Sequence, residues 1–101
     1  MGQSVQPLNI QAYSSQESTN EYIIELQVTS PPDWDELQQP VEAFLIQNGF
    51  SIVEFMYGAD RFTWRLDLAG LTAQFHVELL TTSFWFETDD KVTYNAIKLG
   101  L

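Results

Sequence analysis

The sequence predicts an α+β domain with a mainly antiparallel sheet of about five strands and with its helices packed on one face. Three observations lead to this prediction. Apolar and polar residues alternate along several segments, which is typical of strands with one buried face. One further stretch carries apolar residues at helical spacing. Prolines, glycines and small polar residues separate these segments, and the expected order is strand, helix, four strands, helix.

The chain has 101 residues and a hydrophobic fraction of 45%, which suits a single domain with one core. Residues 1–20 are rich in Gln, Ser and Asn, so we expect a polar, flexible N-terminal segment. Within it, Leu8, Ile10 and Tyr13 could add a short edge strand. Residues 21–101 form the expected α+β domain.

The first strand of this domain is expected over residues 22–28, where every second side chain is apolar. Pro31 and Pro32 end it, because prolines lack a backbone donor. A helix follows and begins near Pro40, since proline is tolerated in a first helical turn. It ends at Gly49, which can adopt the left-handed conformation that closes many helices.

An antiparallel meander makes up the rest of the sheet. Its expected strands are residues 50–57, 61–68, 71–80 and 84–87, and its turns are residues 58–60, 69–70 and 81–83. Thr88 or Asp89 can then cap a short C-terminal helix. The candidates for the buried face of that helix are Val92, Ala96, Ile97 and Leu99.

The turns predict which side chains meet across the strands. A two-residue turn at residues 69–70 pairs Leu68 with Leu71, Trp64 with Phe75, Thr63 with His76 and Arg61 with Glu78. A turn at Thr81-Thr82 would place Val77 beside Phe86, Glu78 beside Trp85 and His76 beside Glu87. One face of the sheet is therefore the core, and the other carries Arg61, Glu78, Trp85, Thr63, His76 and Glu87.

Trp85 is an unusual residue for the polar face of a sheet. An exposed aromatic side chain with aliphatic neighbours can mark a contact surface. The alternative is that the N-terminal segment or the C-terminal helix covers it. The sequence leaves both interpretations open.

Composition argues against several classes of function. There is no cysteine, and 14 acidic residues against four basic ones give a formal net charge of −10, which repels nucleic acid and anionic membranes. No metal-ligand spacing or glycine-rich phosphate loop is present, so no metal and no cofactor are expected. The absence of a signal peptide or a long apolar run favours the cytoplasm.

His76 is the nearest approach to a catalytic group. Glu87 could orient its imidazole, and the Thr63 hydroxyl could exchange a proton with it. All three are expected in mid-strand on a flat face, where cross-strand polar pairing explains them equally well. We therefore assign no catalytic residue, and the enzymatic interpretation remains the alternative.

The meander resembles a family of short, acidic gammaproteobacterial proteins of unknown function. The resemblance lies in Tyr57-Gly58-Ala59-Asp60-Arg61 followed by Trp64, and in Ser83-x-Trp85-Phe86-Glu87. Pro40 at the start of the helix and Gly49 at its end are similar as well, and the match covers roughly residues 22–99. The resemblance implies a bacterial, cytosolic protein and draws attention to Asp60, Arg61, Trp64, Trp85 and Glu87.

The hypothesis that we carry forward is a non-enzymatic protein-binding or adaptor domain. Its binding residues would be Arg61, Trp85, Glu87, His76 and Asp60 on or beside the outer sheet face. The partner is another protein or a second copy of this chain, because homodimers commonly bury self-complementary patches. The alternatives are an enzyme or small-ligand protein using His76, Glu87 and Arg61, and an acidic mimic that binds a nucleic-acid-binding protein.

Overall fold

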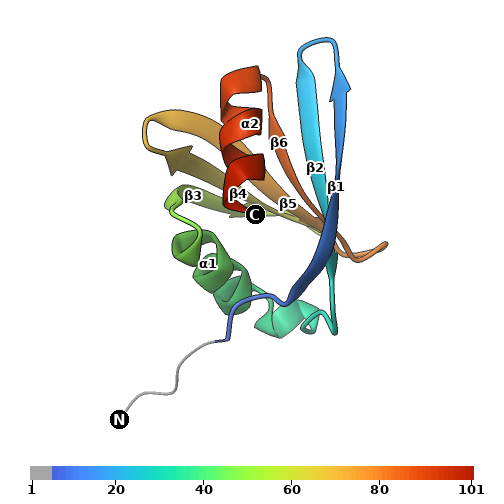
Figure 1. Cartoon of the computed structure of the whole chain (residues 1–101). Helices are drawn as coiled ribbons and strands as arrows, with labels where there is room; N and C mark the ends of the chain where they lie inside the picture. Colours follow the sequence, from blue (N-terminus) through green and yellow to red (C-terminus); the bar gives the residue numbers. More distant parts are fainter. Residues whose placement is uncertain (1–5) are drawn as a thin grey trace.

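The computed structural model describes residues 6–101 and shows one antiparallel sheet with both helices on the same face (Figure 1). The strands are β1 Ile10–Ser18, β2 Glu21–Val28, β3 Ser51–Tyr57, β4 Arg61–Leu68, β5 Leu71–Glu78 and β6 Ser83–Thr88. The helices are a 3₁₀ turn, η1 Trp34–Glu36, and two α-helices, α1 Gln38–Gln47 and α2 Lys91–Gly100. The α+β class and the antiparallel sheet are thus confirmed.

The sheet has six strands rather than about five, in the spatial order β1-β2-β6-β5-β4-β3. The additional strand is β1, which lies within the segment expected to be flexible, at the place where a short edge strand was the other possibility. It pairs with β2 through a hairpin. All of its residues after Ile10 are exposed, so it lacks the apolar alternation that reveals a half-buried strand. Leu8, just before β1, is buried in the core, and its N–H donates to the Pro40 carbonyl at 3.3 Å.

The chain crosses the sheet between β2 and β3. The segment formed by η1 and α1 carries it from β2 to the opposite edge, where β3 begins the meander (Figure 1). The meander then returns, so that β6 pairs with β2 and completes the sheet. This long-range pairing places β5 and β6 near the middle of the sheet, where both of their edges are hydrogen-bonded.

Aromatic side chains dominate the core between the sheet and the helices. Phe75 and Phe86 are opposite one another on β5 and β6, with ring centroids 4.7 Å apart. Phe44 of α1 packs on both rings at 6.1 and 6.3 Å. The Trp64 indole N–H donates to the Glu42 carboxylate of α1 at 3.0 Å, which satisfies the one polar atom of a fully buried side chain.

The register predicted for β4 and β5 is confirmed. Ala69 and Gly70 both have positive φ, as a tight two-residue hairpin turn requires, and Leu68 pairs with Leu71. Trp64 is therefore opposite Phe75, and Thr63 is opposite His76.

The register predicted for β5 and β6 is wrong by two residues. The connection is a four-residue turn over residues 79–82, so Glu78 pairs with Ser83 and His76 pairs with Trp85. The Glu78 carboxylate stabilises this turn by accepting hydrogen bonds from the Thr81 backbone N–H at 2.8 Å and the Thr81 hydroxyl at 2.7 Å. A shift of two residues keeps every side chain on its predicted face but changes its neighbours.

The C-terminal helix begins later than predicted. Asp90, rather than Thr88 or Asp89, is the N-cap of α2 and accepts from the Thr93 N–H at 3.1 Å. This start turns Thr93, Tyr94 and Ile97 into the core. Two of the predicted core residues, Val92 and Leu99, are exposed.

We expect Phe86→Ala to lower the free energy of unfolding by about 3–5 kcal/mol, because it removes a buried ring that three other aromatic rings contact. Chemical denaturation measures this loss. Leu80→Ala is the control, since Leu80 is exposed in a turn and should change the stability by less than about 0.5 kcal/mol. Equal effects of the two substitutions would contradict the described core.

Candidate functional site

The face of the sheet opposite the helices is the outer face. It carries the side chains of Ile23, Glu25, Arg61, Thr63, Arg65, Gln74, His76, Glu78, Trp85 and Glu87. Both α-helices pack on the other side, and β1 extends the sheet at its edge (Figure 1). Within residues 6–101, neither the N-terminal segment nor the C-terminal helix covers Trp85, and residues 1–5 lie outside the described part of the chain.

Trp85 is the centre of an aromatic and cationic cluster on this face. Its ring stacks on the His76 imidazole, with centroids 5.1 Å apart and an interplanar angle of 27°. The guanidinium carbon of Arg61 lies 5.2 Å from the centroid of the same ring, a distance at which a cation is attracted to an indole. Trp85 is partly buried as a result, and both contacts restrict its rotation.

His76 lies beneath this cluster with only 6% of its surface exposed. Its Nδ1 is 3.0 Å from the Thr63 hydroxyl, and its Nε2 is 3.1 Å from the Gln74 side-chain oxygen. A neutral imidazole with its proton on Nε2 satisfies both contacts, since the Thr63 hydroxyl then donates to Nδ1. The Glu87 carboxylate is farther away, at 3.6 Å from Nε2.

Burial lowers the pKa of His76 below its ordinary value. The Glu87 carboxylate opposes this effect and raises the pKa, whereas the Arg61 guanidinium lowers it further. The loss of hydration is the largest of the three influences, so His76 is neutral at pH 7. Both of its nitrogens are engaged, and Trp85 covers its ring. The imidazole therefore has no open path to a substrate.

Carboxylates surround the exposed part of Trp85. Glu25 is directly opposite Trp85 on β2, and Glu87 follows it on the same face of β6. A shallow hollow of about 460 Å³ runs along this row and also includes Ile23 and Arg61. The centre of this surface is thus formed by the Trp85 indole and the Arg61 guanidinium, and acidic side chains form its margin.

Four of the five predicted binding residues share the outer face, and the fifth does not. Arg61, His76, Trp85 and Glu87 lie together, whereas Asp60 is in the turn between β3 and β4. The Asp60 backbone carbonyl accepts from the Leu79 N–H at 2.8 Å and so links two turns at one end of the sheet.

Gln74 and Glu25 are members of the site that sequence analysis missed. Gln74 is two residues before His76 on the same face, so strand alternation could have indicated it. Glu25 could not be placed beside Trp85 from the sequence, because the pairing of β2 with β6 joins segments far apart in the chain.

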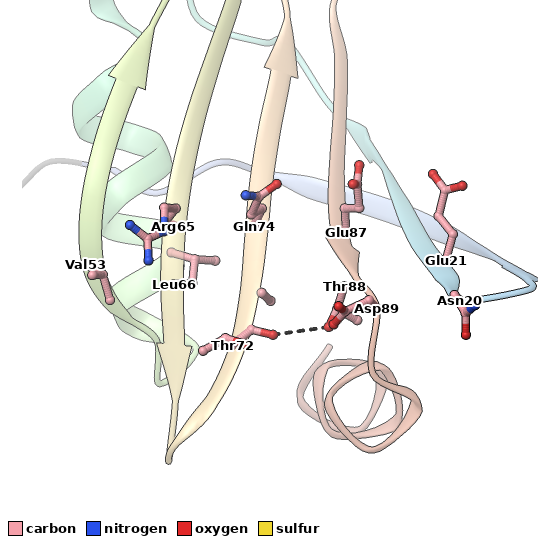
Figure 2. Close-up of a pocket in the computed structure, with 11 residues that line it drawn as sticks. Asn20, Glu21, Val53, Arg65, Leu66, Thr72, Gln74, Glu87, Thr88 and Asp89 are labelled. Atoms are coloured by element: carbon pink, nitrogen blue, oxygen red, sulfur yellow. Dashed lines mark hydrogen bonds between the residues drawn. The ribbon is translucent and has the colours of Figure 1, made fainter.

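A second hollow, of about 400 Å³, lies nearer the end of the sheet where α2 begins. Figure 2 shows Arg65, Gln74 and Glu87 projecting into it from neighbouring strands, and Thr88 donating to the Thr72 carbonyl at 3.1 Å. Two of its polar side chains already have partners: Arg65 pairs with Glu54 at 2.7 Å, and Gln74 bonds to His76. Unlike the Trp85 cluster, the lining of this hollow contains no aromatic side chain.

Among residues 6–101, no three His, Asp or Glu side chains are grouped so as to hold a metal ion. None of the helices in that range is both long and apolar enough to cross a membrane.

Comparison with known proteins places the domain within one sequence family. A family model described as "Protein of unknown function (DUF3630)" matches residues 10–98, from β1 almost to the end of α2. No curated protein and no solved structure matches the chain.

We expect NMR titration of His76, the only histidine, to give a pKa below 6.5. Because this pKa is lower in the folded than in the unfolded chain, His76 contributes stability above about pH 6.5, and the contribution is lost as pH falls through the folded pKa. Trp85→Ala should raise the pKa towards 6.5 by exposing the ring to water. An unchanged pKa in this variant would show that Trp85 does not shield His76.

Proposed function

We propose that this chain, which belongs to the DUF3630 family, is a binding domain that recognises another protein through its outer face. The description of that family assigns no activity, so the argument rests on the site. The observation that carries the proposal is the position of Trp85. Its indole is partly exposed, contacts both His76 and Arg61, and lies on a sheet face that no segment within residues 6–101 covers.

The chemistry of this cluster suits a protein interface. Trp and Arg are the side chains most often found to dominate binding energy, especially where less important contacts surround them. Here the contacts with His76 and Arg61 already restrict the indole, so a partner loses less conformational freedom in binding it. The surrounding acidic side chains would form the polar margin of the interface.

The acidic margin also indicates the chemistry of the partner. Glu25, Glu78 and Glu87 lie around Trp85, and the whole chain carries a formal net charge of −10. A partner with a basic surface would be attracted to this face, and its association rate should fall as salt increases. The carboxylates lie around Trp85 and Arg61 instead of forming a dense acidic row, which favours a protein contact over mimicry of nucleic acid.

The enzymatic alternative, which uses His76, Glu87 and Arg61, has less support. A general base must reach the proton that it abstracts. His76 is buried beneath Trp85, both of its ring nitrogens have hydrogen-bonding partners, and Arg61 lies over the same indole. We place the protein in the bacterial cytoplasm on the basis of its sequence resemblance.

Trp85→Arg should abolish capture of the protein partner, because it replaces the central apolar contact with a charge. The measurement is a pull-down from bacterial lysate at low salt, with quantitative mass spectrometry and cross-linking to identify the partner residues. A captured protein should cross-link beside Ile23, Glu25 or Trp85. Glu25→Lys, a substitution at an exposed position, should weaken the same capture by reversing one charge of the margin.

Trp34→Arg is the matched control. Trp34 is an exposed tryptophan in η1, away from the outer face, so this variant should capture the same partner as the wild type. Circular dichroism must show that all variants are folded. A partner retained by Trp85→Arg and lost by Trp34→Arg would refute the outer-face proposal, and so would cross-links confined to the helical side.

A further inference from the structure

The strand β3 forms one edge of the sheet, and its composition is unusual for an open edge. Five of its seven residues, Ile52, Val53, Phe55, Met56 and Tyr57, are apolar or aromatic. Tyr57 is 75% exposed, Val53 58% and Met56 39%. Proteins commonly protect such an edge with lysine, proline or a bulge, because its unpaired backbone groups can hydrogen-bond to another chain.

A bulge protects only the first part of this edge. The pairing of β3 with β4 shifts between Ile52 and Glu54, so Val53 is out of register. From Glu54 to Tyr57 the ladder is regular. This second part therefore has the regular register that pairing with another strand requires.

The hydrogen-bond pattern shows which backbone groups face outwards. Gly58 donates its backbone N–H to the Arg61 carbonyl of β4 at 2.9 Å. Backbone groups alternate in direction along a strand, so those of Met56 also face β4. Those of Phe55 and Tyr57 consequently face the open edge.

The charge of the molecule limits where two copies can meet. At a formal net charge of −10 per chain, most surfaces of one copy repel the other. The one charged residue of β3, Glu54, is neutralised by the Arg65 guanidinium at 2.7 Å, on the strand behind the edge. The β3 edge is thus a mainly apolar surface at which two acidic chains can meet with little electrostatic repulsion.

We propose that two copies of this chain associate by antiparallel pairing of their β3 strands about a two-fold axis at Met56. In this register Phe55 of each copy is opposite Tyr57 of the other, and the outward-facing backbone groups of both residues are paired. The two Met56 side chains meet at the axis on the outer face, and the Phe55–Tyr57 pairs lie on the opposite face of the joined sheet. No like charges are opposed, and the bulge at Val53 remains outside the paired segment.

This pairing would join two sheets into one and leave the two outer faces on the same side. The inference does not rest on the proposed function, because it is argued from the β3 edge alone. Arg61 of the Trp85 cluster is on β4 and lies beside Met56 and Tyr57. A dimer would nevertheless present two Trp85 clusters to a partner.

Analytical ultracentrifugation over a concentration series tests the proposal. The wild type should show a reversible monomer–dimer equilibrium. Met56→Lys and Met56→Glu should each raise the dissociation constant by about tenfold or more, since like charges would then be opposed at the axis. A one-to-one mixture of these two variants should restore association, because only the mixed pair places opposite charges together.

Two more variants separate this interface from others. Tyr57→Pro removes an N–H that faces the open edge, so it should abolish the dimer and leave the pairing with β4 intact. Trp85→Arg should leave the dimer unchanged. A wild type that is monomeric at every concentration, a Met56→Lys/Met56→Glu mixture that stays monomeric, or a dimer lost in Trp85→Arg but not in Tyr57→Pro would each overturn the proposal.

Discussion

Both faces of the sheet depend on the register between β5 and β6. The Glu78 carboxylate stabilises the four-residue turn that joins them by accepting two hydrogen bonds from Thr81. These bonds lower the pKa of Glu78, and the bond from the Thr81 hydroxyl has the larger effect. This turn places Phe75 against Phe86 in the core and His76 against Trp85 on the outer face. A register displaced by two residues would put Glu87 beside His76 and leave the imidazole uncovered, so the same turn determines core packing and the character of the binding surface.

The interactions in the outer-face cluster are individually weak, but each of them favours the same orientation of the Trp85 indole. A stacked aromatic pair contributes about 0.5–1.5 kcal/mol beyond its buried area, and an exposed cation–π contact about 0.5–1 kcal/mol. These energies are too small to determine the fold, but they are sufficient to favour one orientation of the Trp85 indole. The burial of His76 follows from that orientation, and the lowered pKa follows from the burial. The proposed binding function depends on the same orientation, because a fixed aromatic side chain binds with a smaller loss of entropy.

The sequence predicts those parts of the fold whose causes are local. Strand alternation and the turn at Ala69-Gly70 were enough to pair β4 with β5, because two-residue turns leave one register. The turn before β6 is not predicted in the same way, because Leu79 and Leu80 continue the apolar pattern of a strand and the side-chain hydrogen bonds of Glu78 have no sequence signature. The sequence indicates a short edge strand near Ile10 and Tyr13 but not the extent of β1 to Ser18, because hydrogen bonds to β2, and not burial, hold these exposed residues. Alternation likewise brought Arg61, His76, Trp85 and Glu87 to one face, but Glu25 required the long-range pairing of β2 with β6.

The central claim is that Trp85 is held over His76 and beside Arg61 on an uncovered face. Nuclear Overhauser spectroscopy of the full chain tests it most directly, because the single histidine and three tryptophans can be assigned individually. The account predicts cross-peaks from the Trp85 indole to the His76 ring protons and to the Arg61 methylene protons, with none to residues of α1 or α2. An indole that shows no cross-peak to His76, or that contacts a helix, would contradict both the described outer face and the function proposed for it.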